Sequence, residues 1–183
     1  MDVDRNHRLR PATWQPSPHC DHRPDWAVPE LVVIHCISLP EGEFGTGYPQ
    51  VLFCDGLDGS EAPEFADLEG VRVAPHLLIE RGGELTQFVA FNRRAWHAGQ
   101  SSWRGRNGCN GFSIGIELEG AVASAYSAVQ YEVLLDVLAA LMRRYPRINA
   151  SAIVGHNEIA PERKFDPGPH FNWSGVLAAL YRR

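Results

Sequence analysis

The feature that most constrains the fold is a continuous apolar run at residues 31–34, Leu-Val-Val-Ile, in which three of four side chains are β-branched. A run without alternating polar residues predicts a strand buried on both faces. It ends at His35, shortly before a Pro-Glu-Gly segment. A shorter apolar run at residues 152–154 leads into His156 in the same way. We therefore expect two buried strands that each end near a histidine.

Two further segments predict strands. Residues 76–89 have the pattern of a hairpin, because two β-prone segments flank a turn of Arg-Gly-Gly. Residues 112–118 alternate between apolar and small or polar side chains, which predicts a strand with one face in the core. Gly115 lies on the second face of that strand, where its missing side chain leaves room for another group to approach the sheet.

Two segments predict helices. Ser127 and Gln130 fit a capping box at the start of an amphipathic helix, and Pro146 cannot continue it. A second amphipathic helix is expected at residues 173–181. Strands mixed with a few helices predict an α/β (α+β) fold with a central mixed β-sheet flanked by helices.

The chain shows no internal repeat and no low-complexity linker, so we expect a single domain over residues 1–183. Residues 1–16 are interpreted as an irregular N-terminal leader. Residues 39–75 are rich in glycine, proline and acidic side chains, which predicts a long loop with one or two helical turns. We hypothesise that residues 39–70 form a mobile lid.

Composition excludes several classes of protein. The hydrophobic share of 44% argues against disorder, and the net charge of -5 argues against a nucleic-acid partner. No apolar stretch is long enough for membrane insertion. The polar N-terminus lacks the features of a secretory signal, and the four cysteines show no CxxC spacing, so we expect free thiols and a cytoplasmic location. We expect a monomer.

Two histidines and an aspartate are candidate metal ligands. His35 and His156 each follow a buried strand, and the ends of such strands meet at one edge of a sheet. Asp166 comes ten residues after His156. Two imidazoles and a carboxylate suit Zn²⁺ and leave the fourth tetrahedral position open for water. The spacing leaves an alternative open, in which His35 is a core histidine and His156 a loop residue.

A carboxylate and a lysine complete the candidate site. Glu117 lies on the polar face of its strand, where a carboxylate could take a proton from an attacking water, and Glu119 competes for that role. Lys164 could stabilise the negative oxygen of a tetrahedral intermediate. The alternatives are a solvated strand glutamate and a surface lysine.

Four blocks of sequence carry a resemblance to a known family. They read VIH at residues 33–35, RAWHAG at 94–99, FSIGIELEG at 112–120 and GHNEIAPERKFDPG at 155–168. In these blocks the chain resembles the N-acetylmuramoyl-L-alanine amidases, and the resemblance runs from about residue 17 to 173. Within the family it is most similar to the branch that acts on 1,6-anhydro-muropeptides.

The resemblance implies a mixed sheet with zinc at one edge and one Zn²⁺ per chain. It implies His35, His156 and Asp166 as the metal ligands. The catalytic glutamate then falls on Glu117 rather than Glu119, and the catalytic lysine falls on Lys164. The implied reaction cleaves the amide between the lactyl group of 1,6-anhydro-N-acetylmuramic acid and L-alanine, a step of peptidoglycan recycling.

The resemblance also implies substrate contacts. Trp96 would lie against the sugar, and Arg72 and nearby arginines would bind peptide carboxylates. His97 is counted with the substrate-binding residues, although it and His76 also suit a structural role. Relatives usually carry asparagine at the position of Cys36 and arginine at that of Gly108, and we expect Arg106 to replace the missing charge.

Two other functions remain open from the sequence. A non-catalytic module that binds muropeptides would have the same fold, but it typically lacks a metal ligand. A periplasmic amidase that acts on intact cell wall would need a signal peptide.

Overall fold

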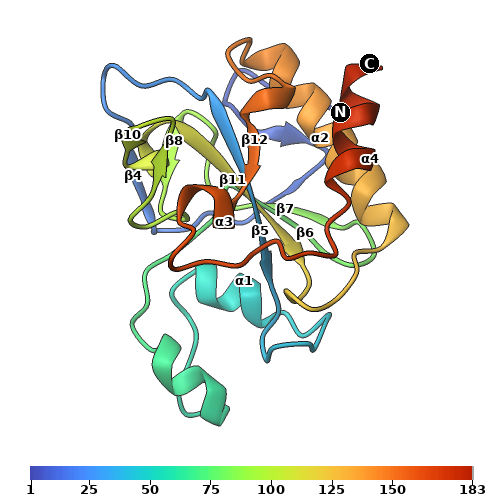
Figure 1. The fold of residues 1–183 in the computed structure, drawn as a ribbon. Coiled ribbons are helices and arrows are strands. Elements are labelled where there is room, and N and C mark those ends of the chain that lie inside the picture. Colours follow the sequence, from blue (N-terminus) through green and yellow to red (C-terminus); the bar gives the residue numbers. More distant parts are fainter. Residues whose placement is uncertain (183) are drawn as a thin grey trace.

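A computed structural model describes residues 1–182. Its centre is a six-stranded sheet in the order β12-β5-β11-β6-β7-β3 (Figure 1). Neighbouring strands are parallel except β6 and β7, so the mixed sheet is confirmed. The strands are β3 Thr13–Trp14, β5 Leu31–Ile37, β6 Leu77–Ile79, β7 Leu85–Gln87, β11 Ser113–Glu119 and β12 Ile153–Gly155.

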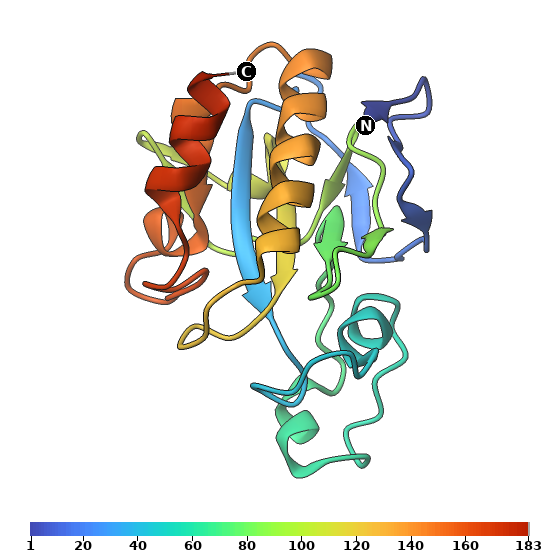
Figure 2. The same cartoon turned by 90° about the vertical axis from the view of Figure 1, so that its right-hand side faces the viewer.

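Two helices cover one face of the sheet, α2 (Ala128–Arg144) and α4 (Trp173–Tyr181) (Figure 2). Both helices are confirmed where the sequence predicts them. The predicted capping box is present, because the Ser127 hydroxyl accepts from the Gln130 N–H and the Gln130 side chain accepts from the Ser127 N–H. The apolar stripe of α2 packs on the even-numbered residues of β5 and β11, and this face forms the largest core cluster.

Short elements and loops cover the opposite face, where Leu31 and Val33 of β5 are fully buried. The site described below lies on this face. The elements are α1 Tyr48–Phe53, η1 Pro63–Leu68, β4 Cys20–His22, β8 Arg93–Ala95, β9 Ser102–Trp103, β10 Arg106–Asn107, η2 Cys109–Gly111 and α3 His156–Ile159. The short η3 (Ala150–Ala152) instead lies beside α4, in the larger core cluster.

The long loop predicted at residues 39–75 is confirmed, and α1 and η1 are its two helical stretches. Figure 1 shows this segment below the sheet, at the end where β5 terminates. Its proposed role as a lid stays a prediction. Within residues 1–182, no helix combines the length and the apolar character needed to cross a bilayer.

The interpretation of residues 1–16 as an irregular leader is wrong. β1 (Asp2–Val3) pairs with β2 (Leu9–Arg10), and β3 joins the central sheet beside β7. Leu9 is buried, and its N–H donates to Oε1 of Gln87 at 2.7 Å. A strand of two residues is too short to show a periodic pattern in the sequence. Such strands form because of their contacts with the rest of the fold.

Candidate metal centre and catalytic site

The carboxyl ends of three parallel strands bring the candidate residues together. His35 of β5 lies directly opposite Glu117 of β11 in the strand register. β12 is parallel to β5 on its other side and ends at Gly155, so that His156 begins α3 at the same edge. The loop after α3 returns to this edge, where the N–H of Asn157 donates to the carbonyl of Asp166 at 3.0 Å.

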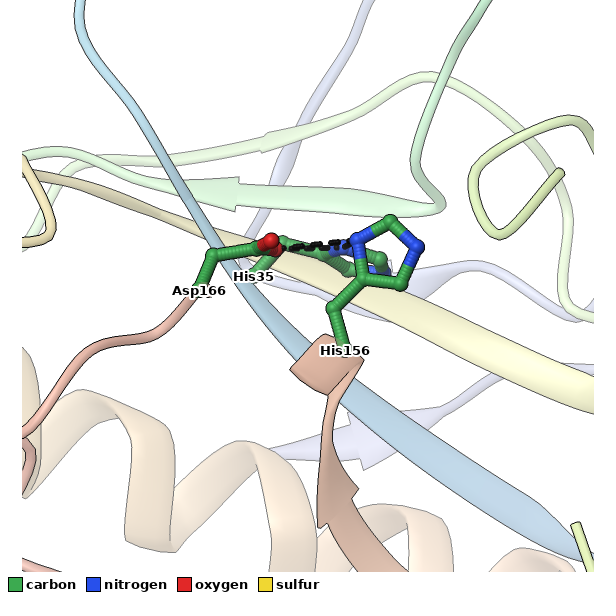
Figure 3. A group of neighbouring side chains, drawn as sticks. All are labelled: His35, His156 and Asp166. Carbon is green, nitrogen blue, oxygen red and sulfur yellow. Dashed lines mark hydrogen bonds and ion pairs between the residues drawn. The ribbon is translucent and has the colours of Figure 1, made fainter. Parts of the chain in front are cut away.

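The side chains of His35, His156 and Asp166 converge on one point (Figure 3). The two Nδ1 atoms are 3.0 Å apart, and Oδ2 of Asp166 lies 3.1 Å from Nδ1 of His35 and 3.0 Å from Nδ1 of His156. Donors bound to one tetrahedral zinc at its usual bond lengths lie about 3.3 Å apart. This triangle therefore fits a single small cation with little movement.

The charge states of these groups also suit a cation. Burial lowers the pKa of His35 to about 4, which leaves its ring neutral at physiological pH. Burial alone would raise the pKa of Asp166, but hydrogen bonds with His156 and His35 hold that pKa below its usual range. A carboxylate and two imidazoles with 1% and 3% exposure are the donor set that zinc prefers.

The far nitrogen of each imidazole is held by the protein. Nε2 of His35 lies 2.9 Å from Nδ1 of His97, and Nε2 of His97 lies 3.0 Å from the Ser113 hydroxyl. Nε2 of His156 lies 3.3 Å from the carbonyl of Ala98. If each Nε2 donates in these contacts, both ligand rings present a lone pair on Nδ1 to the metal position.

The space predicted above Gly115 is filled by His97. A Cβ atom on Gly115 would lie 2.4 Å from the His97 ring. The prediction of a close approach to this strand is therefore confirmed, and the group that approaches is the ring that contacts His35.

The structure separates the two glutamates that compete for the catalytic role. Glu119 is 3% exposed, and its carboxylate accepts hydrogen bonds from the N–H groups of Gly45 and Arg81. Glu117 instead faces the cavity beside His35, and its buried Oε2 has no hydrogen-bond partner among residues 1–182. Burial, and then the charge of Asp166, raise the pKa of Glu117 well above its usual value.

The cavity has a volume of about 450 Å³ and includes all five predicted metal and catalytic residues. Lys164 contributes to its wall, and its positive charge lowers the pKa of Glu117. Much of the remaining wall is apolar and comes from α1, the end of η1 and the segment after it; it includes Leu52, Phe53, Leu68, Val71, Val73 and Ala74. Ile37, Val122, Arg163 and Phe165 also line the cavity.

The predicted substrate-binding residues are spread more widely. His97 lines the cavity, whereas Trp96, Arg72 and Arg106 do not. Trp96 stacks on His19, with ring centroids 6.2 Å apart, and Arg72 is exposed between two residues of the cavity wall. Arg106 pairs with Glu30, so the structure does not bring it to the candidate site.

The two departures from the family pattern have separate surroundings. Cys36 is among the residues that line the cavity, but its side chain packs against the core under α2, and burial raises the pKa of its thiol to about 12. Gly108 has a φ of 75°, a conformation that favours glycine, and lines a second cavity of about 740 Å³ next to Arg163.

Several residues that hold the loops of the site could not be predicted from the sequence. Asn110 contacts the loop that carries His97, Arg163 donates to the carbonyls of Ala98 and Gln100, and Tyr126 donates to the carbonyl of Pro167. These bonds join loops far apart in sequence and leave no local pattern. Ser113 could have been found, since it shares the strand face of Glu117.

Comparison with known proteins shows to which family the chain belongs. Residues 25–169 match the pattern of the family described as N-acetylmuramoyl-L-alanine amidase. The chain belongs to the N-acetylmuramoyl-L-alanine amidase family. The resemblance inferred from the four sequence blocks is therefore confirmed.

Individual relatives agree with this membership. The 1,6-anhydro-N-acetylmuramyl-L-alanine amidase AmpD of Citrobacter freundii is 54% identical over 165 residues, 90% of this chain and 88% of that protein. A crystal structure of a selenomethionine derivative of AmpD superposes with a TM-score of 0.95 at 50% identity, covering 98% of this chain and 99% of that one.

A more distant structure contains a substrate. It is the amidase AmiD of Escherichia coli in complex with anhydro-N-acetylmuramic acid-L-Ala-D-γ-Glu-L-Lys. Its TM-score is 0.62 at 26% identity, and the match covers 86% of this chain and 60% of that chain.

Proposed function

We propose that this chain is a zinc amidase that cleaves the bond between the lactyl group of 1,6-anhydro-N-acetylmuramic acid and L-alanine in peptidoglycan recycling. The observation that carries the proposal is the convergence of His35, His156 and Asp166 beside Glu117 in one cavity. Support comes from the 54% identity to an AmpD enzyme, whose name states this bond. We also propose a cytoplasmic location, as expected from the sequence.

Zinc fits the three ligands in donor type, charge and spacing. When bound, it would act as a Lewis acid that polarises the amide carbonyl and makes water a better nucleophile at neutral pH. The buried rings of His35 and His156 strengthen such electrostatic effects, because little water competes for the charges beside them. The apolar wall from α1 supports this exclusion of water.

Glu117 is suited to move the proton. Its unpartnered carboxylate oxygen can accept the proton of the attacking water, and the same group can return that proton to the leaving amine. The raised pKa of Glu117 favours the first of these steps, because it makes the carboxylate a stronger base.

Lys164 is suited to hold the negative charge. Its ammonium group lies on the same cavity wall and can stabilise the carbonyl oxygen as it becomes an oxyanion. Backbone hydrogen bonds hold the loop that carries Lys164. The N–H groups of Arg163 and Lys164 both donate to the carbonyl of Ala160.

The substrate-binding roles proposed for His97, Trp96 and Arg72 differ in support. His97 is within the cavity, and exposed Arg72 adjoins its wall, where it could reach a peptide carboxylate. Trp96 stacks on His19 and does not line the cavity, so its proposed contact with the sugar rests on the family resemblance alone. The ion pair with Glu30 argues against Arg106. One chain supplies every proposed metal and catalytic residue, so the site does not require a second copy.

Mass spectrometry of reaction products tests the proposal. The zinc-loaded enzyme is incubated with anhydro-N-acetylmuramyl-L-Ala-D-γ-Glu-L-Lys, and the expected products are the anhydro sugar acid and a peptide with free N-terminal L-alanine. A parallel reaction uses the same peptide on ordinary N-acetylmuramic acid and should be slower. Binding without cleavage would indicate a non-catalytic module, and cleavage at another bond would refute the assigned reaction.

A further inference from the structure

We propose that Asn110 is a positioning residue that fixes the orientation of both imidazole ligands through a single side-chain oxygen. The inference rests on the proposed zinc site and adds a residue that lies outside the cavity wall. It concerns how firmly the two ligands are held before the metal binds.

The dipeptide of His97 and Ala98 contacts both ligands. Nδ1 of His97 lies 2.9 Å from Nε2 of His35, and the carbonyl of Ala98 lies 3.3 Å from Nε2 of His156. Two consecutive residues therefore set the rotation of two rings, one from β5 and one from the first residue of α3. A shift of this dipeptide would move both contacts together.

Asn110 holds this dipeptide by its backbone. Its Oδ1 atom accepts from the N–H of His97 at 3.1 Å and from the N–H of Ala98 at 2.8 Å. Ala98 is 1% exposed, so water cannot easily replace the second bond. A carboxamide oxygen has two lone pairs, and both are used here to satisfy consecutive N–H groups.

The residue that carries this oxygen is itself fixed. Asn110 lies in η2, and the half-buried Arg23 guanidinium donates to the carbonyls of Asn110 and Gly111 at 3.2 and 2.9 Å. Arg23 also donates to the carbonyl of Ser113 at 2.8 Å, next to the hydroxyl that contacts the His97 ring. A series of hydrogen bonds thus connects the Arg23 guanidinium, through Asn110 and the dipeptide of His97 and Ala98, to the two metal ligands.

The expected consequence of losing Oδ1 is weaker metal binding. Groups that orient metal-bound histidines typically contribute 10–100-fold in metal affinity. Because one oxygen serves both rings, we expect Asn110→Ala to raise the zinc Kd by about 10–100-fold. Asn110→Asp keeps an acceptor oxygen at the same place and should restore most of the affinity.

The test measures the zinc Kd of purified full-length variants by competition with a chromophoric chelator. Asn110→Ala and Asn110→Ser both remove the oxygen, so either one that folds, as judged by circular dichroism, gives the answer. The matched control is Asn149→Ala, because Oδ1 of Asn149 also accepts two bonds, from the N–H and hydroxyl of Ser151, away from the cavity.

The proposal predicts weaker zinc binding by Asn110→Ala or Asn110→Ser, recovery in Asn110→Asp and no change in Asn149→Ala. The visible spectrum of the cobalt-substituted variants should also change for Asn110→Ala and return for Asn110→Asp. Unchanged affinity in folded variants without the oxygen would overturn the role of Asn110. A wild-type chain that binds no zinc would instead overturn the proposed function.

Discussion

The orphaned oxygen of Glu117 is the residue-scale feature that points most directly to proton transfer. A buried carboxylate oxygen without a partner is unfavourable unless something used in function approaches it. We expect Glu117→Gln, which keeps the shape but cannot accept a proton, to lower kcat by about 10²–10⁴-fold. Zinc content should stay at the wild-type value.

The control for this variant is Glu132→Gln, since Glu132 is exposed on α2. Steady-state release of peptide and metal analysis are measured for both. A Glu117→Gln enzyme with more than a tenth of wild-type kcat would rule out Glu117 as the proton carrier.

Lys164 is the only lysine in the chain, which makes its charge open to chemical test. Acetylation of its Nζ removes the positive charge, whereas reductive dimethylation keeps it. If the charge stabilises the oxyanion, acetylation should lower kcat by about 10²–10³-fold and dimethylation should have a much smaller effect.

The N-terminal amine reacts in both treatments, so a Lys164→Arg variant treated in the same way measures that contribution. Peptide mass spectrometry confirms modification at residue 164. Full activity of the acetylated enzyme would contradict the role of the lysine charge.

At the scale of elements, strand β11 has one face in the hydrophobic core and the other face at the candidate site. Its even-numbered residues pack against α2, and Gly115 and Glu117 face the cavity side. We expect Gly115→Ala to push the His97 ring away, with a loss of about 1–3 kcal/mol in the free energy of unfolding and weaker zinc binding. Gly56→Ala is the control, because its Cβ would meet Val51 at an ordinary 3.4 Å.

Denaturant unfolding and chelator competition measure the two effects of Gly115→Ala. If the variant bound zinc as tightly as the wild type, the contact between His97 and His35 would not matter for the metal site.

Elements with strong periodicity could be predicted from the sequence, and elements defined by distant partners could not. The strands ending near His35 and His156 follow from apolar runs, and α2 follows from its capping box and stripe. Strands β4 and β8 are three residues each and exist because they pair across more than 70 residues of chain. Asn110 was missed for the same reason, since its partners depend on how two loops meet.

At the scale of the whole molecule, the metal site needs the complete fold. His35 and Asp166 are 131 residues apart in sequence, and the sheet between them must form before their side chains meet. A metal that binds only the folded state stabilises the whole domain. At free zinc about 1,000 times its Kd the gain is about 4 kcal/mol, or roughly 10 °C in Tm for a chain of this length.

Thermal unfolding with and without zinc checks this coupling. Asp166→Ala removes one ligand, so its Tm should respond much less to zinc. Equal responses of the two proteins would show that zinc stabilises the chain from another site.

The central claim is that His35, His156 and Asp166 hold the one metal ion on which catalysis depends. Its most direct test is a zinc titration of the metal-free enzyme in which bound zinc and peptide release are measured together. We predict that both rise in parallel and reach a plateau at one zinc per chain. Full peptide release by the metal-free enzyme, or activity that does not follow bound zinc, would contradict the claim.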